Sequence, residues 1–299
     1  MKKIFIYNPE SGKGKVQKQK EYILSKLREK YGKIEECPTK FSGHASQIAK
    51  EACKDCDYIF ACGGDGTLNE IINGIAEQEN KPIIGYIPTG TVNDVARSLG
   101  IKRNIKKATQ NLLDGEIFEH DIFKANSRYG IYVCCAGLFT KSSYDTKRES
   151  KRKFGKIAYF FKGAKEVFGA KPVEVELEVD GEKIKQSVSL ALILNSKSVA
   201  GIKLNKKAKL NDGKVEVVLV HSHRNRITFV ELLRCLNLFI FGVSAHKKNK
   251  HITYRLVDKF SAKVKEGTTI NLDGEKSGEG SFSFEVIKQA VKIIAPKQK

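Results

Sequence analysis

Two short turns in the first third of the chain combine glycine, threonine and a carboxylate. Residues 63–67 read Gly-Gly-Asp-Gly-Thr, and residues 90–94 read Gly-Thr-Val-Asn-Asp. Glycine tolerates positive φ and lets a ligand approach bare backbone. A helix that begins after such a turn presents free N–H groups and a positive dipole end, which suit a phosphate. A carboxylate within that positive loop is typical of a divalent cation held beside bound phosphates.

A structural interpretation competes with this chemistry at both turns. Thr67 and Glu70 have the capping-box spacing, which predicts that a helix begins at Thr67. Thr91 and Asp94 also have capping spacing, and a helix dipole favours an acid at Asp94. Three glycines and an aspartate in four residues are more than a turn requires, so the first turn favours phosphate binding.

The surrounding elements must bring these turns together. Apolar, strand-like runs alternate with helical periodicity: strands at 3–7, 34–39, 58–62 and 82–88, and helices at 17–31, 45–53 and 105–113. This alternation predicts an α/β domain with a parallel, doubly wound, Rossmann-like sheet. Both turns then lie at the carboxyl edge of the sheet, where open α/β folds bind ligands. The Gly- and Lys-rich loop 8–15 could join them, or be a solvated basic loop.

The pattern changes after residue 117, where strand-like alternation replaces long helices. We expect a second domain, an antiparallel β-sandwich or barrel over residues 122–286, after a nucleotide-binding α/β domain of residues 1–121. The second domain holds three Asp-Gly pairs, and by spacing alone each is a turn: Asp180, Asp212 and Asp273, each followed by glycine. A helix predicted over 229–241 could line an acyl-chain cleft or fill core.

Composition limits the partners. The chain has 299 residues and a net charge of +20, which indicates an anionic partner: a nucleotide, an acidic membrane surface or nucleic acid. Residues 141–165 hold nine Lys and Arg against two acids, interleaved with aromatics. That segment could be a packed basic helix or could dock on anionic lipid. No nucleic-acid-binding motif accompanies the charge.

The cysteines and the apolar runs indicate a compartment. The seven cysteines are odd in number and follow no secretory signal, which favours reduced thiols in a cytosolic protein. The single Cys-x-x-Cys at 53–56 has no second pair, so we expect no zinc site. No apolar run approaches the roughly 20 residues of a membrane-spanning helix.

Together the two turns and the Asn-Pro-x-Ser-Gly segment at 8–12 resemble the catalytic domain of the diacylglycerol kinase and sphingosine kinase family. The resemblance covers nearly the whole chain and is strongest to the soluble bacterial lipid kinases. The Gly-Gly-Asp-Gly segment is shared with NAD kinases, whereas residues 90–94 indicate the lipid branch. In similar kinases the C-terminus returns to the first domain, which implies such a return for residues 287–299.

The resemblance implies ATP as the phosphoryl donor, Mg²⁺, and a lipid hydroxyl as the acceptor. It implies acidic catalytic roles near the phosphates for Asp65 and Asp94, and a general base at Glu275. It places a structural Mg²⁺ site at Asp212, with the carbonyls of Lys209 and Lys214. Finally, it implies nucleotide contacts from a set of residues in the turns, namely Asn8, Pro9, Ser11, Gly12, Thr39, Gly63, Gly64, Asp65, Gly66, Thr67, Asn69, Thr91 and Asn93.

The resulting prediction is a lipid kinase that converts ATP and diacylglycerol to ADP and phosphatidic acid. It would be cytoplasmic and peripheral at the inner, anionic face of the membrane, with no nucleic-acid partner. The alternatives are a kinase for phosphatidylglycerol, a sphingoid base or NAD, or a non-catalytic protein that binds nucleotides or nucleic acid. The sequence leaves open the acyl preference and whether the chain forms a homodimer.

Overall fold

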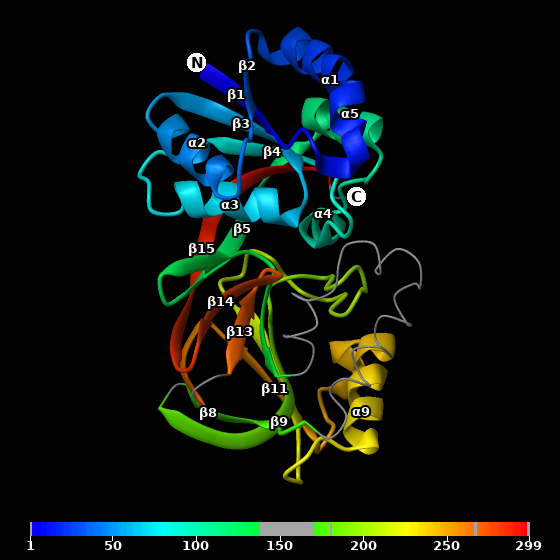
Figure 1. Cartoon of the computed structure of the whole chain (residues 1–299), viewed down its shortest axis with the longest axis vertical. Coiled ribbons are helices and arrows are strands. Elements are labelled where there is room, and N and C mark those ends of the chain that lie inside the picture. The colour runs from blue at the N-terminus through cyan, green and yellow to red at the C-terminus, as the bar shows by residue number, and fades with distance from the viewer. Residues whose placement is uncertain (1, 138–169, 180, 266–267, 298–299) are drawn as a thin grey trace.

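The computed structural model describes residues 2–137, 170–179, 181–265 and 268–297. The basic segment 141–165 and Asp180 lie outside these ranges. The strands of the described ranges form one mixed sheet that runs through both halves of the molecule (Figure 1). The first half is parallel and covered by helices, and the second is antiparallel. The predicted fold class, an α/β domain followed by a β-sandwich domain, is confirmed.

The first half is a doubly wound α/β unit. Four buried apolar runs form its parallel strands, which lie in the order β4-β3-β1-β2: β1 (Lys2–Tyr7), β2 (Glu35–Pro38), β3 (Cys56–Gly63) and β4 (Ile83–Pro88). Two helices pack together on one face, α1 (Lys15–Tyr31) and α5 (Ile105–Asp114). Two others pack together on the opposite face, α2 (His44–Ala52) and α3 (Asp65–Ile75).

The strand order creates a switch point beside β1. The chain moves from β1 outward to β2, then returns to the other side of β1 as β3. The segments that leave β1 and β3 therefore diverge to opposite faces of the sheet. A crevice opens at the carboxyl end of such a pair, and it is the usual ligand site of open α/β sheets.

The second half is built from antiparallel strands around one long ribbon. Its strands are β5 (Glu116–Ala125), β6 (Arg128–Gly130), β7 (Val133–Gly137), β8 (Val173–Val179), β9 (Glu182–Leu194), β10 (Val215–His221), β11 (Ile252–Val257), β12 (Lys259–Val264), β13 (Thr269–Leu272), β14 (Glu275–Glu279) and β15 (Phe282–Ala295). Strands β8 and β9 pair in the antiparallel sense, with Val179 opposite Glu182. The helix α9 (Phe229–Phe241) packs on β10.

The β5–β15 ribbon joins the two halves. Near its end β15 also pairs in parallel with β4, where Ile293 and Ile294 lie opposite Ile84 and Gly85. The ribbon register breaks between Ile287 and Val291. Because both strands run from one half into the other, the halves share a continuous sheet.

Asp121 stabilises the backbone at the register break of this ribbon. It is fully buried in β5, and its carboxylate accepts the N–H of Gln289 at 2.7 Å and that of Gly213 at 2.7 Å. Gln289 lies at φ +51°, in the left-handed region. The predicted domain boundaries, at 121 and 287, fall beside this point.

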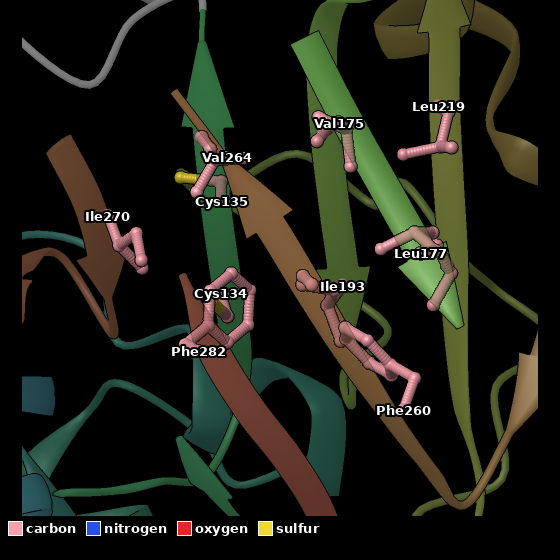
Figure 2. Close-up of a pocket in the computed structure, with 14 residues that line it drawn as sticks. Cys134, Cys135, Val175, Leu177, Ile193, Leu219, Phe260, Val264, Ile270 and Phe282 are labelled. Carbon is pink, nitrogen blue, oxygen red and sulfur yellow. The ribbon is translucent and has the colours of Figure 1, made fainter. Parts of the chain in front are cut away.

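The core of the second half is almost solid. Figure 2 shows apolar side chains from several strands, including Leu177, Phe260 and Phe282, converging on one small cavity. The cavity volume is about 20 Å³. That is room for about one water molecule, so this cavity does not hold an acyl chain as it stands.

Both predicted threonine caps are wrong. Helix α3 begins at Asp65 with Gly64 as its N-cap, and α4 (Asp94–Leu99) begins after Asn93; neither cap residue makes a side-chain hydrogen bond to the helix. Glu70 instead accepts the N–H of Ala45 at 3.2 Å, which ties α3 to α2. Tertiary contacts thus overrode the local capping pattern. Because no side chain caps α3, its first N–H groups stay available to a ligand.

Candidate functional site

Three loops pack together at the carboxyl edge of the parallel sheet. The two glycine turns touch directly, because a Cβ on Gly90 would lie 2.6 Å from the Cα of Gly64. Thr89 donates its N–H to the carbonyl of Gly63 at 2.8 Å. The Thr89 hydroxyl also hydrogen-bonds to that of Ser11 at 2.8 Å. Glycine is required at position 90 by this close approach rather than by φ, whereas a Cβ on Gly64 would make a tight contact of 3.3 Å with the Cα of Gly90.

The loop after β1 packs against the two glycine turns, and the three loops together form a cradle. Asn8 accepts the N–H of Glu10 on its side chain at 2.9 Å and that of Ser11 on its carbonyl at 3.0 Å, forming a tight turn through Pro9. Gly12 lies at φ +63°, and a Cβ there would be 3.1 Å from the carbonyl oxygen of Thr89. The predicted nucleotide contacts of this loop therefore lie beside both glycine turns.

Other predicted contacts lie at the same edge. Thr39, just beyond β2, donates its N–H to the carbonyl of Tyr7 at the end of β1 at 2.9 Å. Thr67 packs in the first turn of α3 against Gly63, where a Cβ would lie 2.5 Å from Thr67. Thr91 is exposed at the tip of the second glycine turn. The sheet topology thus gathers residues predicted from four separate segments.

Asp65 is the carboxylate at the centre of this cradle. It is the first residue of α3, is only partly accessible, and accepts the N–H of Val95 at 3.3 Å. Burial and, to a lesser extent, the nearby charge of Asp94 together raise the pKa of Asp65 to about 7. A partly buried carboxylate with this pKa, at a helix N-terminus, is a strong candidate for a functional group.

Asp94 lies deeper and joins the halves. Its side chain is buried, and Oδ1 accepts the Ser198 hydroxyl at 2.6 Å and the Gly201 N–H at 2.8 Å. Burial raises the pKa of Asp94, while these hydrogen bonds oppose the increase. Because that oxygen already has two donors, the geometry favours a positioning role for Asp94, and its predicted catalytic role stays a prediction.

The second glycine turn is held by Asn93, for which a nucleotide contact is predicted, and by two arginines that sequence reasoning missed. Asn93 is fully buried in the left-handed region at φ 57° and donates its amide to the carbonyl of Gly90 at 2.8 Å. Arg97 donates to the carbonyl of Val92 at 3.0 Å. Arg103 donates to the carbonyl of Thr91 at 2.9 Å. The two guanidinium groups add positive charge behind the turn, and no local motif marks them.

Glu275 comes from the second half and faces the first glycine turn. Its Oε1 lies 3.7 Å from the position of a Cβ on Gly66. Its other oxygen forms a salt bridge of 3.2 Å with Arg128, which also donates to the carbonyl of Lys276 at 3.0 Å. The pair is half exposed, so its contribution to stability is at most about 1 kcal/mol. The ion pair instead orients the Glu275 carboxylate.

Asp273, two residues before Glu275, is a buried anchor. It occupies the first turn position between β13 and β14 at φ +52°. Its two oxygens accept four hydrogen bonds of 2.7 to 3.0 Å, from Ile131, Tyr132 and Val133 N–H groups and the Asn69 amide. Burial raises the pKa of Asp273 to about 6, against these hydrogen bonds. The spacing of the sequence identified only a turn here.

Asn69 connects this anchor to α3. Its amide donates to Asp273 and to the carbonyl of Tyr129, and its oxygen accepts from Asn73 at 3.1 Å. The side chain is buried. The nucleotide contact predicted for Asn69 stays a prediction, and the geometry favours a role in fixing the second half against α3.

The predicted structural Mg²⁺ site lies in the turn before β10. Asp212 accepts the N–H of Lys214 at 3.2 Å and lies near Asp121, whose pKa is raised by burial and by the charge of Asp212. Within the described ranges no three His, Cys, Asp or Glu residues are placed to hold a metal ion. The predicted site uses one carboxylate with the carbonyls of Lys209 and Lys214, so it stays a proposal.

Comparisons with known proteins match both halves of this geometry. The profile of the diacylglycerol kinase catalytic domain matches residues 2–125, and that of the YegS C-terminal NAD kinase beta sandwich-like domain matches residues 136–295. A diacylglycerol kinase of Bacillus subtilis (strain 168) is 34% identical over 98% of this chain and 96% of its own length. The chain belongs to the diacylglycerol kinase family. It is therefore a lipid kinase.

Further relatives of this kinase agree. A diacylglycerol kinase of Staphylococcus carnosus (strain TM300) is 33% identical over 98% of this chain and 94% of its own. A solved structure from Bacillus anthracis (strain Sterne) superimposes with a TM-score of 0.85 at 25% identity, covering 98% of this chain and 95% of that one. In the part of the kinase that the structure describes, no helix is both long and apolar enough to cross a bilayer.

Proposed function

We propose that this kinase transfers the γ-phosphoryl group of ATP to the free hydroxyl of diacylglycerol, which yields phosphatidic acid and ADP. The observation that carries the proposal is the approach of Glu275 to Gly66 across the two halves. A carboxylate able to accept a proton thereby faces a glycine turn able to hold phosphates. The relatives named diacylglycerol kinase support the choice of acceptor.

The phosphates of ATP, the phosphoryl donor, would be held by backbone groups rather than by side chains. The bare glycines of both turns, the uncapped N-terminus of α3 and the loop after β1 converge on one edge. Arg97 and Arg103 add positive charge behind the second turn. Phosphoryl transfer depends mainly on alignment and charge neutralisation, which this arrangement would provide.

Asp65 is the residue that fits a divalent cation. It is a partly buried carboxylate beside a second acid, and both its burial and the charge of Asp94 hold its pKa high. The negative charge of such a carboxylate is poorly stabilised by its buried surroundings. A hard cation such as Mg²⁺, which prefers oxygen ligands, would stabilise it. When bound, Mg²⁺ would supply further charge neutralisation for the phosphates. Asp94 would keep α4 and the loop at 198–201 in place behind it.

At the acceptor end Glu275 would act as general base. As the lipid hydroxyl forms its bond to the γ-phosphorus, the bond from that phosphorus to the β–γ bridging oxygen breaks. The hydroxyl proton passes to the Glu275 carboxylate. Arg128 would hold that carboxylate in its reactive orientation through their 3.2 Å ion pair.

The place of action proposed for this kinase is the cytoplasmic face of an anionic membrane. Its acceptor resides in the bilayer, and the net charge of +20 favours an anionic surface. The basic segment 141–165 lies outside the described residues. No nucleic-acid partner is proposed.

Transfer of label from γ-labelled ATP tests the proposal. The acceptors should be diacylglycerol, phosphatidylglycerol, a sphingoid base and NAD, each at equal concentration. We expect phosphatidic acid as the main product. Asp65→Asn and Glu275→Gln should each lower kcat by about 10²-fold or more, because each removes a charge at the reacting centre.

Glu279→Gln is the matched control for Glu275. Both glutamates lie on β14, are half exposed and form an ion pair, but Glu279 pairs with Lys276. It should retain wild-type kcat. Preferential labelling of another acceptor would replace diacylglycerol in the proposal. Full activity of Glu275→Gln would remove that residue from the mechanism.

A further inference from the structure

An exposed apolar stripe runs along α9. Eight large hydrophobic side chains are exposed in the part of the chain that the structure describes, and five of them belong to this one helix: Phe229, Val230, Leu233, Ile240 and Phe241. Phe241 is 67% exposed and Phe229 is 62% exposed. The stripe positions follow the helical repeat, so they share one face. No described residue covers that face.

The opposite face of α9 is firmly attached to the domain. Leu232, Cys235 and Leu238 are buried against the second half. Thr228 and Glu231 form a capping box, in which the Glu231 carboxylate accepts the Thr228 N–H at 2.7 Å. Figure 1 shows α9 along the outside of the second half. Its exposed stripe is therefore presented by a fixed helix and does not result from a frayed element.

The surroundings of the stripe are cationic. Between residues 222 and 256 the only acid is Glu231, which is buried and also accepts a hydrogen bond of 2.8 Å from Ser222. The same span holds seven basic residues, none of which forms a salt bridge with another described residue: Arg224, Arg226, Arg234, Lys247, Lys248, Lys250 and Arg255.

The fold gathers part of this charge at the start of α9. His223 Nε2 and His251 Nδ1 lie 3.2 Å apart, so the loop before α9 lies beside the segment that leads into β11. Arg224 and Arg226 therefore lie at the same end of the helix as Lys250, and all three are exposed. Aromatic and aliphatic side chains above a cationic rim are typical of a helix that lies in the interface of an anionic bilayer.

We propose that α9 is a membrane-docking helix, which inserts its apolar stripe among the lipids of an anionic bilayer while the basic residues around it contact the headgroups. The inference rests on the proposed lipid acceptor. A second copy of the chain is a poorer occupant, because a twofold contact would place identical cationic rims against each other. Nucleic acid would leave the apolar stripe without a partner.

Vesicle co-sedimentation without nucleotide tests the docking directly. The full-length protein should bind vesicles of phosphatidylcholine with 30 mol% phosphatidylglycerol, and bind pure phosphatidylcholine or vesicles in 0.5 M NaCl far less. Phe229→Ser combined with Ile240→Ser should lower the vesicle partition coefficient tenfold or more. Arg226→Gln combined with Lys250→Gln should lower it severalfold.

Ile240→Ser and Ile117→Ser form a matched pair, since Ile240 is 59% exposed on α9 and Ile117 is 50% exposed on β5. Only the α9 variant should lose binding, and both should keep the wild-type melting temperature. Wild-type binding by the Phe229 and Ile240 double variant would overturn the proposal. So would a change of that variant from dimer to monomer in analytical ultracentrifugation, because the stripe would then be a subunit interface.

A kinetic comparison separates this proposal from the proposed function. On a short-chain, water-soluble diacylglycerol below its micelle concentration, the double variant should match the wild type. On diacylglycerol in vesicles it should lose activity in proportion to binding. If the wild type phosphorylates neither form, the proposed function fails, and the vesicle assay still decides the docking.

Discussion

Asp65 shows most clearly what one residue contributes. As the first residue of α3 it accepts a hydrogen bond from Val95, but burial and the charge of Asp94 outweigh the relief that this bond gives to its own charge. Such strain at a half-buried carboxylate is expected where a cation or a reacting group is to be stabilised. Stability and function therefore conflict at this position.

We expect Asp65→Asn to stabilise the protein in a pH-dependent way. Burial raises the pKa of Asp65 to about 7 in the folded state, above its usual 3.8. The folded protein thus keeps a proton that the unfolded chain has released, and this contribution to stability is lost as pH rises from about 4 to 7. Asparagine avoids the loss, so the variant should exceed the wild type by on the order of 2 kcal/mol at pH 8 and by little at pH 5.

Urea denaturation of both proteins at the two pH values, in EDTA, measures this difference. Added Mg²⁺ should then raise the stability of the wild type at pH 8 and leave the variant unchanged. An equal free-energy difference at pH 5 and pH 8 would show that Asp65 is ionised throughout this range.

At the scale of elements, the site depends on the contact between two strand-to-helix turns. A side chain at Gly90 would lie 2.6 Å from the Cα of Gly64 and 2.8 Å from the amide oxygen of Asn93. The turns must therefore separate to admit even a methyl group. Neither turn can be adjusted alone, since Thr89 also binds Gly63 and Ser11.

Gly90→Ala should consequently weaken nucleotide binding. We expect a loss of about 1–3 kcal/mol of stability from overpacking, and an increase of tenfold or more in the KM for ATP. Steady-state kinetics with varied ATP and thermal denaturation measure the two effects.

Gly74→Ala is the matched control, because a Cβ there would lie 2.3 Å from the carbonyl oxygen of Ser46, at the contact between α2 and α3. It should lose similar stability with little change in the KM for ATP. Equal effects of both variants on KM would mean that the loss at Gly90 is general destabilisation.

At the scale of the whole molecule, two buried aspartates hold the halves together. Asp94 of the first half binds Ser198 and Gly201 of the second, and Asp273 of the second half binds Asn69 of the first. These contacts lie beside the turns and so bring Glu275 to α3. Packing between the halves therefore sets the distance between the glycine turns, which would hold ATP, and Glu275, the proposed general base.

Asp273→Asn should destabilise the protein and misplace the base. An amide cannot accept on both of its ends, so at least one buried N–H loses its partner, at a cost of about 1–3 kcal/mol. Because Glu275 follows two residues later, kcat should fall while the KM for ATP changes less. Differential scanning calorimetry and steady-state kinetics measure these effects. Asp258→Asn, an exposed aspartate, should change neither, and wild-type stability of Asp273→Asn would show that the four hydrogen bonds contribute little.

Much of the fold was predictable because its helices and strands follow from the local periodicity of apolar residues. The strands of the first half are short apolar runs, and α1, α2, α5 and α9 were found within two residues of their ends. The starts of α3 and α4 were not, because close contacts between glycine turns outweighed two threonine capping patterns. Capping is worth only about 1 kcal/mol, which tertiary packing easily overrides.

By itself the sequence determined the chemistry on offer: glycine turns after parallel strands, a carboxylate in the first of them, and Glu275 by its resemblance to a family. Only the tertiary structure decided which groups meet. It gathered the loop at 8–12, both turns and Glu275 at one edge, and committed Asp94, Asp273 and Asn69 to holding the halves together. It also left the apolar side of α9 uncovered by any described residue. The physical reason is separation along the sequence. Periodicity reflects residues that are close together in the chain, whereas these contacts join residues up to about 200 positions apart.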